Sequence, residues 1–300
     1  DPLWSRGLGD VYKRQPLARL AAACTLALGA VAPALAADAF PSCPITVVIP
    51  FPPGGATDVL GRVIGQKLGD TLGQTVVVEN RAGAGTIIGA SYVAKAAPDG
   101  YTVLVSSGTT FTVNPAIRNN LPYDPVKSFD PIGIAGRTGL ILLANKDVPV
   151  QTVKQFVDYV KASPDKYAYG SFGSGTTAQF AGEIVLSATG LKMTHVPYKG
   201  SAPAMTDLMG GQIPFTVDTV SAAIPQLKSG KIKAIAVTTA KRSALLPDVP
   251  TMAENGYPDI NMDTWLVLAA PKGLPADVKA KLEKAPVSYT HLRAHETRED

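Results

Sequence analysis

The sequence predicts a two-lobed α/β protein, and three observations indicate this fold class. From Ile45 onward, short β-branched apolar runs alternate with amphipathic runs of helical length, a pattern typical of mostly parallel sheets covered by helices. The alternation forms two blocks of about 100 residues each, which is the size of a small domain. The Pro-rich segment 247–251 carries the chain back toward the first block. We therefore expect two lobes, with the chain crossing between them twice.

The elements of the first block follow from residue type and spacing. Ile45–Pro50 is continuous, β-branched and ends at a proline, as a buried strand does. The run 57–72 has apolar residues at helical spacing and begins with Thr57 and Asp58, which are good N-cap residues. The same criteria predict a helix at 86–97 and strands at 75–79, 101–106, 132–135 and 140–144.

The second block repeats the alternation. Its expected helices are 152–162, 176–188, 202–209 and 221–229, and its expected strands are 167–171, 193–197, 213–218 and 232–238. A strand at 265–269 and a helix at 276–284 follow the return segment. We assign residues 37–145 to lobe 1, together with 252–285, and residues 146–251 to lobe 2.

Both ends of the chain differ in character from the two lobes. Arg14 and Arg19 precede an apolar run that ends in the small-x-small pattern Ala34-Leu35-Ala36, which is typical of an export signal with its cleavage site. We assign residues 1–36 to a foreign lead-in plus a signal peptide and expect an exported protein. Residues 286–300 include the polar stretch "VSYTHLRAHETRED", which breaks the alternation, so we expect a non-native tail.

Composition excludes several classes of function. The net charge is +4 and the basic residues are spread without clusters, so we expect no nucleic-acid partner. Between residues 37 and 285 there is one histidine, His195, and one cysteine, Cys43, too few for a His/Cys zinc site. No G-x-x-x-x-G-K-[ST] loop or G-x-S-x-G elbow is present. We expect no catalysis, no metal and no cofactor.

Loops rich in Gly, Ser and Thr follow several of the expected strands. In open α/β sheets, ligands bind beyond the carboxyl ends of strands, and the free N–H groups of helix starts favour an anion. Loops 50–58, 79–90, 106–110 and 169–180 fit this description, and Tyr198 and Asp218 follow two further strands. The candidate ligand-binding residues from these positions are Gly54, Gly55, Thr57, Ser106, Gly173, Ser174, Gly175, Thr176, Thr177, Tyr198 and Asp218.

Each of these positions also has a purely structural interpretation. Loop 50–58 is equally well described as a turn with an N-cap, and loop 169–180 as a connector capped by Thr176. Lys199, beside Tyr198, is either a ligand residue or a solvated charge. Asp218 either fixes a ligand amine or a water, or caps the following helix.

Two other functions compete with ligand capture. The segment "GAGTIIG" approaches the dinucleotide fingerprint of an oxidoreductase, but its third glycine is one residue late and Asn80, Arg81 and Ala82 separate it from its strand. An effector domain of a transcription regulator shares this fold class, but it needs a helix-turn-helix upstream, where the export signal lies.

Long stretches of the chain resemble the Bug family, the solute receptors of tripartite tricarboxylate transporters. The resemblance rests on "PITVVIPFPPGGATDVLGR", "GQTVVVENRAGAGTIIGASYVAKAAPDGYTVLV", "YGSFGSGTTAQFAGE", "HVPYKGSAPAMTDLMGGQI" and "GKIKAIAVTTAKRSALLPDVPTMAENGYP". These motifs lie in order between Pro44 and Ala285. The resemblance implies the periplasmic-binding-protein fold of the second type, a Venus flytrap with one ligand at the hinge cleft.

The resemblance also implies a function and a site. Bug proteins capture small carboxylates in the periplasm for the membrane components of a transporter, and we expect this chain to do so as a monomer. Loop Pro53–Asp58 and Thr86 of lobe 1 are expected to pinch the ligand carboxyl against Gly173–Thr177 and Asp218 of lobe 2. Family members continue past residue 285 with helices that complete the first lobe, so we expect the C-terminal part to be truncated. Few ionic residues lie in the loops, which favours a monocarboxylate or a compact dicarboxylate over citrate.

Overall fold

The computed structural model describes residues 40–287. The expected lead-in and signal peptide at 1–36 lie outside the described residues, as does nearly all of the expected tail at 286–300. Within residues 40–287, no helix combines the length and the apolar character that crossing a bilayer requires.

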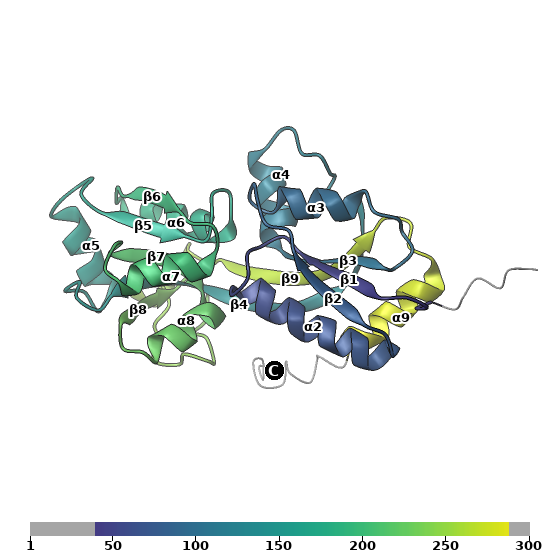
Figure 1. Ribbon diagram of the computed structural model, residues 1–300. Coiled ribbons are helices and arrows are strands. Elements are labelled where there is room, and N and C mark those ends of the chain that lie inside the picture. The colour runs from purple at the N-terminus through teal and green to yellow at the C-terminus, as the bar shows by residue number, and fades with distance from the viewer. Residues whose placement is uncertain (1–39, 288–300) are drawn as a thin grey trace, which may run out of the picture. The chain divides into compact units, whose positions relative to one another are not determined.

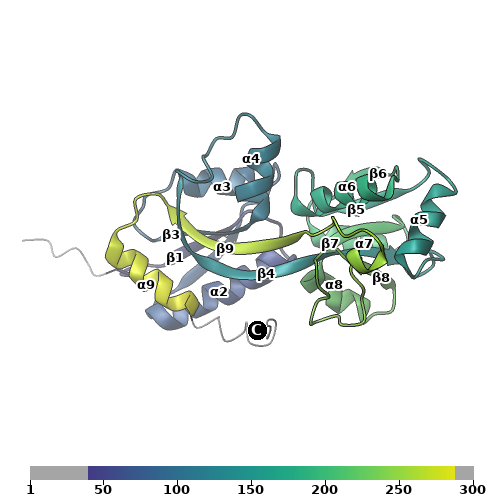
Figure 2. The same ribbon diagram turned by 180° about the vertical axis from the view of Figure 1, so that it is seen from behind.

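The first lobe is a parallel sheet with helices on both faces. Strands β1 (Ile45–Ile49), β2 (Val76–Asn80) and β3 (Thr102–Ser107) are parallel in the order β2-β1-β3, and β9 (Asp263–Pro271) runs antiparallel beside β3. Helices α2 (Ala56–Leu72) and α9 (Ala276–Val287) lie side by side, and α3 (Ile87–Ala94) covers the opposite face (Figures 1 and 2).

Alternation along β1 divides the core of this lobe into two layers. Val47 packs in the cluster that contains Ile64 of α2 and Leu282 of α9, whereas Val48 packs with Val93 of α3. Successive side chains of a strand point to opposite faces, so a strand covered on both faces must be apolar throughout. This explains the β-branched run that predicted the strand, which is apolar except for Thr46.

The second lobe has the same construction. Strands β5 (Ala168–Ser171), β6 (Thr194–Pro197) and β7 (Phe215–Thr219) are parallel in the order β6-β5-β7. One core cluster contains residues of α5 (Val153–Lys161) and α6 (Thr177–Thr189), with Phe156 and Phe215 in edge contact. The other cluster contains residues of α7 (Ser201–Met209), α8 (Val220–Leu227) and β8 (Ile232–Val237).

One long strand belongs to both sheets. Strand β4 (Phe129–Asn145) pairs with β9 over 129–139 and with β7 and β8 over 140–145. The two short strands expected at 132–135 and 140–144 are therefore one. Pairing changes between Gly139 and Leu140, whereas the sequence-based boundary, Asn145, is the last residue of the strand. On the return, Met252 and Ile260 are buried in the core of the second lobe, ahead of β9.

Most expected elements occur within a few residues of their predicted bounds, and the exceptions are short. A π-helical turn, η1 (Thr109–Val113), leads into α4 (Asn114–Ile117), and a 3₁₀ turn, η2, covers Ala253–Asn255. The run from Thr109 to Val113 is rich in β-branched residues, which have low helix propensity, and the sequence therefore indicated a loop. Single π-helical turns are often found at functional sites.

At position 89 in α3, close packing leaves room for no residue larger than glycine. A Cβ atom there would lie 2.8 Å from the carbonyl oxygen of Arg81 and 3.0 Å from Cα of Pro50, both of which are backbone atoms. We expect Gly89→Ala to lower the free energy of unfolding by about 1–3 kcal/mol, despite the higher helix propensity of alanine. Denaturant unfolding against Gly133→Ala, where an added Cβ meets nothing within 4 Å, is the measurement. Equal stability of the two variants would contradict this account of the packing.

Candidate functional site

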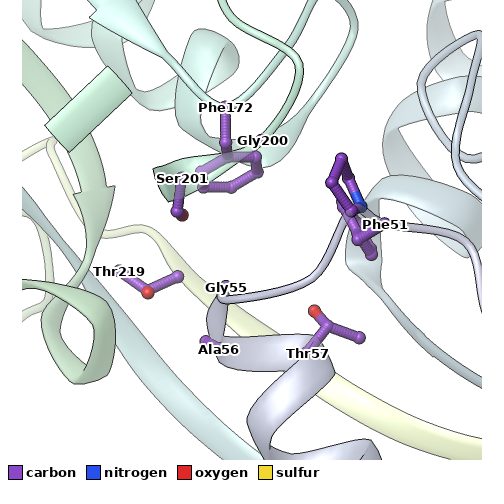
Figure 3. Close-up of a pocket in the computed structure, with 9 residues that line it drawn as sticks. Phe51, Gly55, Ala56, Thr57, Phe172, Gly200, Ser201 and Thr219 are labelled. Atoms are coloured by element: carbon purple, nitrogen blue, oxygen red, sulfur yellow. The ribbon is translucent and has the colours of Figure 1, made fainter. Parts of the chain in front are cut away.

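A cavity lies where the first turns of three helices meet. It encloses about 300 Å³, including space open to solvent. Figure 3 shows the side chains of Thr57, Phe172, Ser201 and Thr219 around this space, with Gly55 and Ala56 at the start of α2. The described residues that line it are Phe51, Pro52, Gly55, Ala56, Thr57, Phe172, Gly200, Ser201 and Thr219.

The start of each helix supplies backbone N–H groups at this cavity. The N-cap residues of α2 and α7 are Gly55 and Gly200, and neither helix has a side-chain cap. The N-cap of α8 is Thr219, whose hydroxyl accepts from the N–H of Ala222. No residue of the described lining carries a charge. Unpaired N–H groups and the positive ends of helix dipoles suit an anion bound without a cationic side chain.

The loop before α2 is held in place by Asp58. Its carboxylate accepts from the N–H of Gly54 (3.0 Å), from Asn80 (2.8 Å) and from Arg62, which also forms an ion pair with it at 3.0 Å. Burial raises the pKa of Asp58, but these hydrogen bonds outweigh it, and the pKa lies below its ordinary value. Asp58 therefore shapes the loop, and both of its oxygens are already engaged.

Asp218 lies directly behind the cavity lining. Its side chain is fully buried, and its Oδ1 accepts from the Ser201 hydroxyl (2.7 Å) and the Thr219 N–H (2.7 Å). Its Oδ2 has no partner among the described residues. Burial raises the pKa of Asp218 to about 6, against the opposing effect of these hydrogen bonds. A buried carboxyl with one unused oxygen is unusual in a protein interior.

A buried polar chain connects β3, the loop before α3 and α4. The hydroxyls of Ser106 and Thr110 lie 2.6 Å apart, and Thr110 donates to Thr86 Oγ1 at 2.7 Å. Asn114 donates to the carbonyl of Gly85 (2.7 Å) and to Thr86 Oγ1 (3.2 Å). Thr86 has a positive φ of 80°, which costs a non-glycine residue about 1–2 kcal/mol. The polar chain offsets this cost.

Loop 173–177 of the second lobe closes on itself and on the first lobe. Thr176 donates to the carbonyl of Gly173 (2.7 Å), and Gly175 N–H donates to Gln179 (2.7 Å). The N–H of Thr177 donates to Thr109 Oγ1 of the first lobe at 3.1 Å, whereas the buried Thr177 hydroxyl has no partner among the described residues.

The predicted residues thus fall into three groups. Gly55 and Thr57 line the cavity, and Gly54 lines an adjoining hollow of about 400 Å³ that contains Met205 and Met209. A second group does not line the cavity, and all of its members except Gly173 and the exposed Ser174 are buried: Asp58, Thr86, Ser106, Gly173, Ser174, Gly175, Thr176, Thr177 and Asp218.

Pro53 and Tyr198 form the third group, which is also absent from the cavity lining. Pro53 is exposed. The hydroxyl of Tyr198 donates to Asp207 at 2.8 Å, and desolvation together with Asp207 raises the pKa of Tyr198 to about 12. Its hydroxyl is committed to a partner on α7.

Sequence reasoning missed several lining residues. Thr219 ends β7, Gly200 precedes α7 and Ser201 begins it, so the strand-end rule that selected their neighbours would have found them. Phe51 and Phe172, in edge contact with ring centroids 6.2 Å apart, gave no signal, because an aromatic residue after a strand is more often core. Asn114 begins α4, beyond the predicted loop 106–110, in a stretch with no predicted element. Among the described residues, no group of three His, Cys, Asp or Glu side chains is placed to hold a metal ion.

Comparison with known proteins places the chain in a family. The sequence pattern described as "Tripartite tricarboxylate transporter family receptor" matches residues 60–296. Protein BugT of Bordetella pertussis is 38% identical over 249 residues, which are 83% of this chain and 76% of BugT.

Solved structures agree in fold. R. palustris Rpa4515 with adipate is 35% identical, with a TM-score of 0.82 over 86% of this chain and 88% of that one. MatC (Rpa3494) from Rhodopseudomonas palustris with bound malate is 34% identical, with a TM-score of 0.80 over 86% and 90%. The predicted two-lobed periplasmic-binding-protein fold is confirmed.

Proposed function

Because the chain belongs to the tripartite tricarboxylate transporter receptor family, we propose that it captures a small carboxylate in the periplasm and delivers it to the membrane components of such a transporter. It acts as a monomer, without catalysis, a metal or a nucleic-acid partner. The ligand is a monocarboxylate or a compact dicarboxylate.

One observation carries this proposal: the uncapped starts of α2 and α7 and the start of α8 converge on a cavity with a neutral lining. A carboxylate placed there accepts charge-assisted hydrogen bonds, which are stronger than those between neutral groups. The related proteins with adipate and malate support the same ligand class.

Capture requires that the ligand prefer the form in which the lobes meet. The cavity takes Phe51, Gly55 and Thr57 from the first lobe and Phe172 and Ser201 from the second, so a ligand in it contacts both. A ligand shifts a conformational equilibrium only by its difference in affinity for the two forms. Simultaneous contact with both lobes supplies this difference and presents one particular surface to the transporter.

A thermal-stability screen tests the proposal. Malate, adipate, short monocarboxylates, citrate, sugars and nicotinamide nucleotides are added to the protein, with the dimethyl esters of malate and adipate as uncharged controls. A ligand at one hundred times its Kd stabilises the native state by about 2.7 kcal/mol. We expect stabilisation by one or a few carboxylates and none by their esters. Stabilisation by nucleotides alone, or by sugars alone, would contradict the proposal.

A further inference from the structure

A buried acid behind a cavity for an anion needs an explanation. Asp218 is fully buried, and no side chain of opposite charge within residues 40–287 bonds to it. Three hydrogen bonds reach its carboxyl, and all of them end on Oδ1. The two residues that donate them, Ser201 and Thr219, both line the cavity. A change in the charge of Asp218 therefore alters the hydrogen bonds that two lining residues make to a single atom, Oδ1.

The effect on a ligand depends on which hydrogen bond the Ser201 hydroxyl can donate. A serine hydroxyl has one proton to donate. While Asp218 is ionised, that proton points at Oδ1, and Ser201 offers the cavity only oxygen lone pairs, which repel a carboxylate. Once Asp218 is protonated, its own O–H can donate, and the Ser201 hydroxyl is free to donate to a ligand. Protonation also removes a like charge from the surroundings of the ligand.

We propose that Asp218 takes up one proton when the carboxylate ligand binds, so that the receptor captures an anion and a proton together. This inference rests on the proposed function and adds its dependence on pH. No bond other than O–H forms or breaks, and the proton comes from the solvent.

The charged groups of the surrounding elements leave Asp218 as the titrating residue. Asp207 of α7 is bonded to a tyrosine, and Tyr169 of β5 donates to Glu183. In the first turn of α2, Asp58 is paired with Arg62. The residue opposite Asp218 on β4 is Ile141. None of these ionisable groups contributes to the raised pKa of Asp218, whose cause is burial.

The sign of the pH dependence follows. The free protein holds the proton below about pH 6, and an anion in the cavity holds it to higher pH. Binding therefore takes up close to one proton at pH 7–8, and the Kd rises about tenfold per pH unit there by linkage. Below about pH 6 the Kd for the malate dianion becomes independent of pH, because the free protein is already protonated; the malate monoanion is left out of the ligand concentration. Malate is fully ionised above pH 6.5 and does not itself change charge in this window.

Calorimetry of the full chain with malate, repeated with adipate, tests the proposal. Titration at pH 7.5 in buffers of different ionisation enthalpy gives the number of protons taken up, and titrations between pH 5.5 and 8 give the slope. Asp218→Asn keeps an oxygen for the Thr219 N–H and imitates the neutral acid. We expect this variant to bind at pH 8 within about threefold of the wild-type affinity at pH 5.5, with no proton uptake. His195→Gln is the matched control, because burial lowers the pKa of His195, which bonds Ser171 at 2.7 Å outside the cavity lining.

The outcomes separate the two proposals. Proton uptake that persists in His195→Gln and vanishes in Asp218→Asn supports the inference. Binding without proton uptake, or loss of binding in a folded Asp218→Asn protein, overturns it and assigns Asp218 as an ionised acceptor for a ligand amine or hydroxyl. If no carboxylate of the thermal screen stabilises the wild type at pH 5.5 or pH 8, the proposed function fails, and this inference fails with it.

Discussion

Gly200→Ala is expected to weaken carboxylate binding by about 10- to 100-fold. Gly200 lines the cavity with a φ of +110°, and an added Cβ would lie 3.0 Å from Cγ and 3.2 Å from Cβ of Pro52. Gly200 belongs to the second lobe and Pro52 to the first, so the methyl group wedges the lobes apart where the ligand must contact both. Overpacking of this kind costs about 1–3 kcal/mol, and each 1.4 kcal/mol is about tenfold in affinity. Calorimetric Kd values measure the effect.

Gly256→Ala is the control for this experiment. Gly256 also has a positive φ, +91°, but an added Cβ would meet nothing within 4 Å. Both variants carry backbone strain of about 1–3 kcal/mol, and both are expected to melt at lower temperature than the wild type. Only Gly200→Ala should lose affinity. Equal affinities for the two variants would show that contact between Pro52 and Gly200 is irrelevant to capture.

Asn114→Leu is expected to have the largest effect on stability. Asn114 is fully buried, and its amide donates to the Gly85 carbonyl, to Thr86 and to the Tyr123 hydroxyl. Leucine has a similar volume but leaves the Gly85 carbonyl without this donor, at about 1–3 kcal/mol for a buried group. It also removes the bonds to Thr86 and Tyr123, whose hydroxyls keep only Thr110 as a partner within the described part of the chain. We expect a loss of about 3 kcal/mol or more, which for a chain of this size lowers the melting temperature by roughly 10 °C.

Asn119→Leu, at an exposed position five residues later, should leave the melting temperature within about 1 °C of the wild type, as surface substitutions usually do. Amide hydrogen exchange locates the damage: the N–H groups of residues 85–90 should lose protection in Asn114→Leu alone. Unchanged exchange in that segment would mean that Asn114 does not support the loop before α3.

The sequence predicted the helices and strands well because buried positions require apolar residues, and this requirement is visible in the residue types. The run at β1 had to be apolar on both faces, and α2 had to carry an apolar stripe toward the sheet. The hydrogen-bond and ion-pair partners of polar side chains were much less predictable. The spacing of Tyr198 gave no sign that its hydroxyl reaches Asp207. Arg62 stands four residues after Asp58 on the same helix, a spacing that favours their ion pair, but nothing near Asp58 in the sequence showed that Asn80 would bond to it. Such pairings depend on tertiary placement, which no local pattern records.

The aromatic residues of the site could not be predicted from the sequence for a related reason. Phe51 and Phe172 meet only when the two lobes are assembled, and each alone fits a core residue equally well. Glycine and hydroxyl residues at helix starts are different, since their local role already favours a ligand. The prediction was therefore strongest for backbone donors and weakest for the side chains that surround the rest of a ligand.

The continuity of β4 through both sheets sets the kind of motion that the lobes can perform. Residues 129–139 of this 17-residue strand pair with β9 as a hydrogen-bonded ribbon where the first lobe ends. Sliding one strand along the other would break a row of backbone hydrogen bonds, whereas twisting and bending the ribbon preserves them. Shear between the lobes is thereby suppressed and rotation is allowed. A transporter in contact with both lobes would then recognise the ligand-bound receptor by the angle between its lobes rather than by the chemistry of the bound ligand.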